Sequence, residues 1–328
     1  MEIGSFLEMQ FPKGMEYRKG DKDIARLNTA RQAIWHAFRV LRQAQEPVSN
    51  VIWIPYYQCD SIRETLKAHD VEIKYYHQDK NFNPTDLTAK DDDAVVLVNY
   101  YGIMSSERMR ILAQTFKHPI IDCAQAFFCK PVEGALMVYS CRKFVGVPDG
   151  AYVVGKDVHK FVEEYPQCYS SDTAKFLLTR IEYGCEGKGY EDRFVNENRI
   201  DHEDCMRMSK LTHTILDGTD YEYIIRKRKE NFNYIQEKLA DINLIDPTFF
   251  MDEDTVPMVY PLVIVDDEVI KRLYAAKHFQ GRWWGYVAKE QPEGSFEHWI
   301  ASNIIPVTID QRYGTEEMDY LVKVIKNL

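Results

Sequence analysis

The chain has 328 residues, of which 45% are hydrophobic and 28% charged, the composition of an ordinary globular protein long enough for two domains. Its 51 acidic side chains outnumber the 41 basic ones, and the formal net charge of −10 excludes a general nucleic-acid binder held by a basic face. Residues 1–22 mix charged and apolar side chains, unlike a signal peptide, and no apolar run reaches the length of a membrane span. We therefore expect a soluble, cytoplasmic protein that binds neither nucleic acid nor membranes.

The seven cysteines form no Cys-x-x-Cys pair, and several lie in apolar, strand-like runs. We interpret them as buried thiols rather than as disulfides or zinc ligands. The nine histidines show no ligand spacing such as His-Glu-x-x-His. The sequence therefore predicts no catalytic metal held by protein side chains.

Apolar runs and helical patterns alternate through the first half of the chain. Apolar residues recur at helical spacing over 30–41, and Asn28 or Thr29 can cap the start of that helix. Further helices are predicted at 61–68 and 109–116, and strands at 51–54, 71–76, 94–98, 119–122, 135–139 and 151–154. This alternation predicts an α/β fold with a mostly parallel sheet covered by helices on both faces.

Helical patterns dominate the second half, after Gly155. An exposed Gly-rich loop is predicted at 183–190, and a long charged helix at 221–239. A strand at 260–265 and helices at 269–278 and 316–328 follow. We place the domain boundary in the long helix, which gives a large domain over 1–222, including an N-terminal arm, and a smaller α/β domain over 223–328.

Ligands of doubly wound sheets bind outside the carboxyl ends of the strands, so polar residues just after the apolar runs are the candidates for chemistry. These candidates are Tyr56, Tyr57, Asn99, Asp122, Gln125, Ser140 and Lys143. The helix beginning at Thr29-Ala30-Arg31 adds an anion site, because its free N–H groups and positive dipole end favour a phosphate. Neither Gly-x-Gly-x-x-Gly nor Gly-x-x-x-x-Gly-Lys occurs, so a dinucleotide or a nucleoside triphosphate held by those motifs is not supported.

This set contains what a pyridoxal phosphate site needs: a lysine for a Schiff base, an acid for the pyridine nitrogen, phosphate-binding groups and an aromatic ring. Each residue also has a simpler interpretation. Lys143 beside Arg142 can be a surface basic pair, and Asp122 can cap a helix or form a turn. The order and spacing of Asp122 and Lys143 favour the functional interpretation.

Several segments resemble the DegT/DnrJ/EryC1/StrS family of pyridoxal phosphate-dependent, fold type I nucleotide-sugar aminotransferases. The segments are Asp122-Cys123-Ala124-Gln125, Ser140-Cys141-Arg142-Lys143, Pro148-Asp149-Gly150-Ala151, Asn28-Thr29-Ala30-Arg31, Val98-Asn99-Tyr100-Tyr101-Gly102, Ile304-Ile305-Pro306-Val307 and Asp310-Gln311-Arg312-Tyr313. The resemblance covers most of the chain. It implies a fold type I transferase in nucleotide-sugar and polysaccharide biosynthesis.

The resemblance also implies a role for each site residue. Lys143 would carry pyridoxal 5'-phosphate as a Schiff base and then move the proton, and Asp122 would keep the pyridine nitrogen protonated. Gln125 would bond the cofactor's 3-oxygen. Ser140, the N–H groups of Ala30 and Arg31, and the Thr29 hydroxyl would hold the phosphate.

The chain departs from the family pattern in two places that concern the site. Cys59 stands where many relatives have an aromatic residue, so Tyr57 or Tyr56 is expected to stack on the cofactor ring. The Gly-x-Asn-Tyr stretch that reaches the partner's phosphate site in relatives is not recognisable before Met206. A homodimer with shared active sites is still implied.

The resulting hypothesis is an aminotransferase that moves an amino group from an amino acid, glutamate by resemblance, to the keto group of a nucleotide-linked sugar. One alternative is a non-catalytic fold type I protein that binds the cofactor or a sugar nucleotide. The other is a dehydratase or lyase of the same fold. Related sugar dehydratases carry His where Lys143 stands, which favours the aminotransferase.

Overall fold

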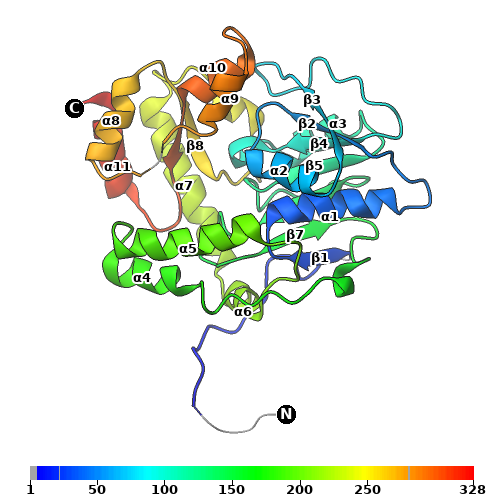
Figure 1. The fold of residues 1–328 in the computed structure, drawn as a ribbon. Helices are drawn as coiled ribbons and strands as arrows, with labels where there is room; N and C mark the ends of the chain where they lie inside the picture. Colours follow the sequence, from blue (N-terminus) through cyan, green and yellow to red (C-terminus); the bar gives the residue numbers. More distant parts are fainter. Residues whose placement is uncertain (1–5, 22, 280) are drawn as a thin grey trace.

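The structure, a computed structural model, describes residues 6–21, 23–279 and 281–328. Its largest element is a seven-stranded sheet with the order β1-β7-β6-β5-β4-β2-β3 (Figure 1). The strands are β1 (Ile24–Leu27), β2 (Val51–Pro55), β3 (Glu72–Tyr76), β4 (Ala94–Val98), β5 (Pro119–Cys123), β6 (Leu136–Ser140) and β7 (Ala151–Val154). The predicted α/β architecture is confirmed.

Five neighbouring strands, from β3 to β6, run parallel, whereas β7 is antiparallel to both β6 and β1. Every residue of β4, β5 and β6 is buried, which is why these strands appear in the sequence as continuous apolar runs. Asp122 pairs in register with Val98 on one side and Val138 on the other. The carboxyl ends of the three central strands therefore lie at the same edge of the sheet.

Three helices accompany these strands: α1 (Ala30–Arg42), α2 (Asp60–Ala68) and α3 (Ser106–Ala113). Helix α1 contacts β5, β6 and β7, and it buries Ala33, Ala37 and Phe38 at helical spacing. The predicted helices at 30–41 and 61–68 are confirmed. Helix α3 begins three residues before the predicted 109, because the Ser105 hydroxyl accepts from the Arg108 N–H and caps it there.

The segment after β7 contains α4 (Lys175–Tyr183), α5 (Lys188–His202) and α6 (Lys210–Asp217). Helices α4 and α5 pack side by side as a hairpin (Figure 1). The loop predicted at 183–190 is shorter than expected, since α5 begins at Lys188. Gly184 and Gly187 both have positive φ angles, 80° and 52°, so this tight connection depends on glycine.

The chain ends with α7 (Tyr221–Leu239), β8 (Val259–Val263), α8 (Asp267–Ala275), α9 (Gly285–Glu290), α10 (Phe296–Asn303), β9 (Ile304–Thr308) and α11 (Thr315–Lys326). Strands β8 and β9 form a second, antiparallel sheet, and α7 packs against β8 and α11. Short 3-10 helices span Tyr100–Gly102, Val162–Glu164 and Pro247–Phe250. The predicted boundary at 222/223 falls in the first turn of α7, and the division into two domains stays a prediction.

Within the described residues, no helix combines the length and apolarity that crossing a membrane requires. All seven cysteines are free thiols. Cys123, Cys141, Cys168 and Cys205 are buried as predicted, whereas Cys59, Cys129 and Cys185 are partly exposed.

Candidate active site

The Asp122 carboxylate lies near the carboxyl end of β5 and is almost completely buried. Its Oδ1 accepts a hydrogen bond from the Ala124 N–H at 2.9 Å, and its Oδ2 accepts one from the Gln58 side-chain amide at 3.3 Å. Burial raises the pKa of Asp122, while the Ala124 N–H, Lys143 and Gln58 oppose that rise. The two donors fix the orientation of the carboxylate.

Lys143 lies in the turn that follows β6. The Phe144 and Val145 N–H groups both donate to the Cys141 carbonyl, at 3.1 and 2.9 Å, and this tight turn presents the Lys143 side chain three residues after Ser140. Part of the residue is exposed to solvent, and its ammonium has no hydrogen-bond partner among the described residues. It is available to a ligand.

The charges around Lys143 act on its ammonium in opposite directions. Desolvation by the surrounding protein lowers the pKa of Lys143, and the guanidinium groups of Arg142 and Arg31 lower it further. The Cys59 thiol and the Asp122 carboxylate favour the charged form. A lowered pKa increases the fraction of neutral amine, the form in which lysine is a nucleophile.

Gln125 is held by the backbone of the segment that follows β4. Its Oε1 accepts a hydrogen bond from the Tyr101 N–H at 2.7 Å, and its amide nitrogen has no partner in the part of the chain that the structure describes. A Cβ at Gly102, where φ is +71°, would lie 2.4 Å from the Gln125 carbonyl oxygen, so this close approach requires glycine. Gln125 is thereby fixed with one donor group unused.

Further unused donors lie at the N-terminus of α1. The Thr29 hydroxyl accepts from the Gln32 N–H at 3.4 Å, whereas the N–H groups of Ala30 and Arg31 have no partner among residues 6–21, 23–279 and 281–328. Ser140, at the end of β6, is buried and leaves its hydroxyl free of hydrogen bonds to the described residues. Such donors at the positive end of a helix dipole fit a phosphate group.

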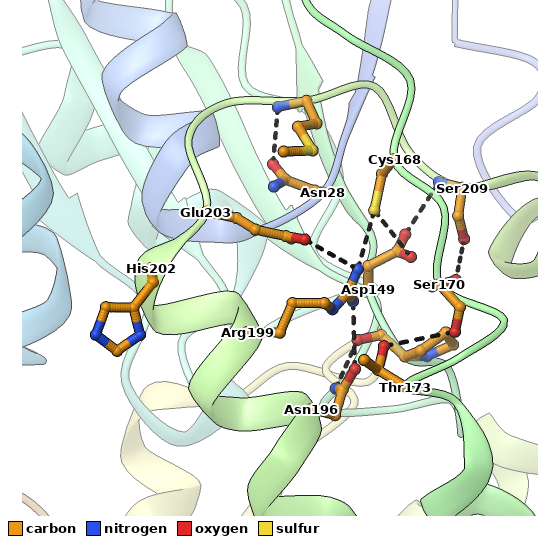
Figure 2. Close-up of polar contacts among 12 residues, drawn as sticks. Asn28, Asp149, Cys168, Ser170, Thr173, Asn196, Arg199, His202, Glu203 and Ser209 are labelled. Carbon is orange, nitrogen blue, oxygen red and sulfur yellow. Dashed lines mark hydrogen bonds and ion pairs between the residues drawn. The ribbon is translucent and has the colours of Figure 1, made fainter.

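The segment that follows α5 anchors the turn before α1 (Figure 2). Asn28, fully buried, donates to the Asp204 carbonyl at 2.9 Å and accepts from the Met206 N–H at 3.2 Å. Arg199 donates to Glu203 at 3.3 Å and to the Cys168 sulfur at 3.2 Å. This polar network, which also includes Asp149, Asn196 and Ser209, fixes the start of α1.

No protein-family model and no curated protein sequence matches the chain. Solved structures do match along almost its whole length. The sugar aminotransferase CalS13 from Micromonospora echinospora has a TM-score of 0.65 at 16% identity, covering 94% of this chain and 88% of that one. The chain has the fold of the sugar aminotransferases.

Two other solved structures agree with this assignment. A DegT DnrJ EryC1 StrS aminotransferase from Brucella abortus has a TM-score of 0.62 at 13% identity, covering 94% of this chain and 86% of that one. The E. coli GDP-4-keto-6-deoxy-D-mannose-3-dehydratase, with bound hydrated PLP, has a TM-score of 0.64 at 15% identity, covering 93% of this chain and 88% of that one. The predicted fold type I architecture is confirmed, and the sugar aminotransferase fold here carries Lys143 and Asp122 at its strand ends.

The aromatic residues proposed to stack on a cofactor ring lie in two different surroundings. Tyr57 is completely buried, and its hydroxyl contacts that of Tyr101 at 2.6 Å. Tyr56 instead stacks on Tyr75, with ring centroids 5.0 Å apart. A ligand could touch Tyr57 only if the neighbouring rings moved, and its stacking role stays a prediction.

Three features of this site were not predicted from the sequence. Gln58 bonds Asp122, and the strand-end rule that selected Tyr57 could have found it one residue further on. The other two are ion pairs from α5, Asp201 with Arg31 at 2.7 Å and Glu197 with Arg142. No local pattern indicated them, because α5 meets the site only through the tertiary fold.

Proposed function

We propose that this protein is a pyridoxal phosphate-dependent aminotransferase that moves an amino group from glutamate to the keto group of a nucleotide-linked sugar. One observation carries the proposal. The unpaired amine of Lys143 follows β6 and the oriented carboxylate of Asp122 lies near the carboxyl end of the neighbouring strand β5, and the charge of each group acts on the pKa of the other. An amine and an acid so placed suit opposite sides of a pyridoxal ring.

The unused donors of the site fit the remaining groups of the cofactor. Gln125 would donate its free amide to the 3-oxygen, and the donors of Ala30, Arg31, Ser140 and Thr29 would hold the phosphate. When bound, pyridoxal phosphate stabilises a carbanion on the substrate carbon. Asp122 would keep a proton at the ring nitrogen, and Lys143 would attach the cofactor and later transfer a proton at its Nζ.

The sugar substrate is inferred from the structural neighbours together with Lys143. The CalS13 structure is described as a sugar aminotransferase, and the E. coli neighbour is named for a keto-sugar nucleotide on which it acts as a dehydratase. Lys143 is the residue that favours amino transfer over dehydration, because a lysine can both hold the cofactor and return the proton.

We further propose a cytoplasmic homodimer with shared active sites. The N-terminal arm carries Phe6, Leu7, Met9 and Met15 with more than half of each side chain exposed, and Figure 1 shows the arm extending away from the body. The α4–α5 hairpin exposes a second apolar group, made of Leu178, Ile181, Tyr183, Tyr190, Phe194 and Val195. Exposed apolar surface of this extent supports a protein–protein contact. A monomer in light scattering at micromolar concentration, with full activity, would contradict the dimer.

The experiment on the cofactor is reduction of the purified protein with borohydride, followed by peptide mapping. We expect the cofactor to be fixed on the peptide containing Lys143, and Lys143→Ala to abolish that label. Labelling of another lysine would refute the assignment. In a separate sample that has not been reduced, glutamate should discharge the bound cofactor, as seen by absorbance.

The amino acceptor is tested in the second half-reaction, starting from the glutamate-treated protein. A nucleotide-linked keto hexose should restore the original absorbance, whereas pyruvate and oxaloacetate should not. Restoration by keto acids at catalytic rates would refute the sugar substrate. Failure of every amino donor would favour the non-catalytic alternative, and release of a dehydrated sugar would favour the dehydratase.

A further inference from the structure

Two thiols lie against each other directly beside the candidate site. Cys123, the last residue of β5, is buried, and Cys129 is partly exposed. Each thiol acts on the pKa of the other, which places the two side chains close together. Two consecutive turns bring them together, because the Ala126 N–H donates to the Cys123 carbonyl at 2.8 Å and the Cys129 N–H donates to the Ala126 carbonyl at 3.0 Å.

Cys129 lies where a small oxidant can reach it. It lines a small surface pocket together with Ser106, Lys130 and Thr255. The Ser106 hydroxyl lies 3.6 Å from the Cys129 sulfur. Arg18 donates to the Cys129 carbonyl at 2.9 Å, which places a buried guanidinium beside this residue.

These neighbours stabilise the thiolate of Cys129. The interaction with Cys123 lowers the pKa of Cys129 most, and burial raises it. Ser106, Asn99 and the charge of Arg18 lower it further, so the pKa of Cys129 falls to about 7. Burial has the opposite effect on Cys123, whose pKa rises well above its ordinary value. The pair therefore contains one reactive, accessible sulfur and one protected sulfur.

We propose that Cys123 and Cys129 form a reversible disulfide when the protein meets a hydroperoxide. The Cys129 thiolate attacks a peroxide oxygen, the O–O bond breaks, and the departing oxygen takes a proton to leave as water or an alcohol. Cys129 is then a sulfenic acid. The Cys123 sulfur attacks it, the S–O bond breaks, and water leaves with the Cys123 thiol proton. In total, two thiols are oxidised by two electrons and one peroxide is reduced.

The disulfide would close a loop that carries residues of the candidate site. Gln125 lies inside the loop, and Asp122 immediately precedes Cys123. Side chains alternate between the two faces of a strand, so Asp122 points toward Gln58 while Cys123 points toward Cys129. The oxidation state of Cys123 and Cys129 thus acts on the backbone that positions Asp122 and Gln125.

The experiment treats the purified protein with hydrogen peroxide and counts free thiols by alkylation under denaturing conditions. We expect two of the seven thiols to disappear, to map to Cys123 and Cys129 joined within one peptide, and to return after dithiothreitol. Cys129→Ser should abolish the loss. Cys141→Ser is the matched control, because Cys141, like Cys123, is a buried thiol at the carboxyl end of a central strand, and this variant should leave the disulfide intact.

A second measurement traps the intermediate with dimedone. Cys123→Ser should accumulate the Cys129 sulfenic acid and take up dimedone at least tenfold more than the unmodified protein, in which Cys123 resolves the intermediate. Equal dimedone labelling in both proteins would overturn the proposal. Peroxide treatment that leaves Cys123 and Cys129 both alkylatable, or that joins either one to a different cysteine, would overturn it as well.

Discussion

Gln58 donates its side-chain amide to Asp122 Oδ2 at 3.3 Å and so connects the end of β2 to the end of β5 across the intervening strand β4. The Tyr286 hydroxyl, from α9, donates to the carbonyl of the same Gln58. The acid of the candidate site is therefore oriented by a residue that the C-terminal part of the chain also contacts. Gln58 acts as a positioning residue.

Replacing Gln58 with Ala should slow the glutamate half-reaction about tenfold, since a hydrogen bond to a charged group contributes about 1.5 kcal/mol or more. Losing this donor also raises the pKa of Asp122, because Gln58 stabilises the charged carboxylate. The acidic limb of the pH–rate profile should shift to higher pH. Gln43→Ala, at the C-terminus of α1, is the control, and an unshifted profile would show that Gln58 is only structural.

Asp122→Ala should retain bound cofactor but lower the transamination rate at least about 100-fold, the usual cost of a lost electrostatic partner. The measurement is the rate of absorbance change with glutamate. A near-normal rate would show that Asp122 serves only the turn in which it bonds the Ala124 N–H.

The same carboxylate should reduce the stability of the cofactor-free protein. Burial raises the pKa of Asp122 in the folded protein above the ordinary 3.8, so the folded protein binds a proton at this carboxyl more tightly than the unfolded chain does. The free energy of unfolding is therefore highest below pH 3.8, where the carboxyl is neutral in both states, and it falls as the pH rises through the pKa of the folded protein. Asp122→Asn should therefore unfold at a higher temperature than the wild type at pH 7. The difference should vanish near pH 3.5, and a constant difference across this range would contradict the assignment.

His36, in α1, predicts a second pH dependence. It is fully buried, its ring nitrogens contact the Tyr165 hydroxyl and the Val158 carbonyl, and burial lowers its pKa from 6.5 to about 4. The unfolded chain takes up the proton first, so about 3 kcal/mol of stability should be lost as the pH falls from 6.5 to 4. The free energy of unfolding, measured with urea, should depend on pH in this way in the control His118→Gln, whose wild-type ring is partly exposed. The dependence should disappear in His36→Gln.

The sequence predicts the central sheet and the cluster of chemistry at its edge, because buried parallel strands leave long apolar runs and the polar residues after them are easily identified. It does not predict β1, which has only four residues, with partly and fully buried positions in alternation. This strand is defined by its pairing with β7, which lies far along the chain. Strand β9 was recognised only as a family segment, since its single proline, Pro306, and its apolar residues show no clear strand period. The sequence does not predict the roles of Asp201 and Glu197 in α5 for a similar reason. Their spacing is that of a solvated helix face, and only the tertiary fold brings them to Arg31 and Arg142.

The Asp201 carboxylate of α5 should weaken phosphate binding at the N-terminus of α1. Asp201 neutralises Arg31, whose N–H group is one of the free donors there. Asp201 is half exposed, so the ion pair is worth no more than about 1 kcal/mol. Asp201→Asn should tighten pyridoxal phosphate binding about two- to fivefold at low salt, and the gain should shrink at high salt. Asp192→Asn, which removes the partner of Lys175 in the same hairpin, should leave the affinity unchanged.

The proposed dimer gives the last prediction, which concerns the exposed face of the α4–α5 hairpin. Ile181 and Phe194 expose 82% and 62% of their surface, one on each helix of the hairpin. If a second copy covers this face, each buried side chain contributes about 1.5–3 kcal/mol to association. The double variant Ile181→Ser, Phe194→Ser should therefore raise the dimer dissociation constant at least 100-fold and yield monomers in light scattering.

The matched control is Ile111→Ser, on α3, which changes a residue that is 56% exposed and should leave the protein dimeric. A double variant as dimeric as the control would assign the contact to the N-terminal arm, where Phe6→Ser and Leu7→Ser repeat the measurement.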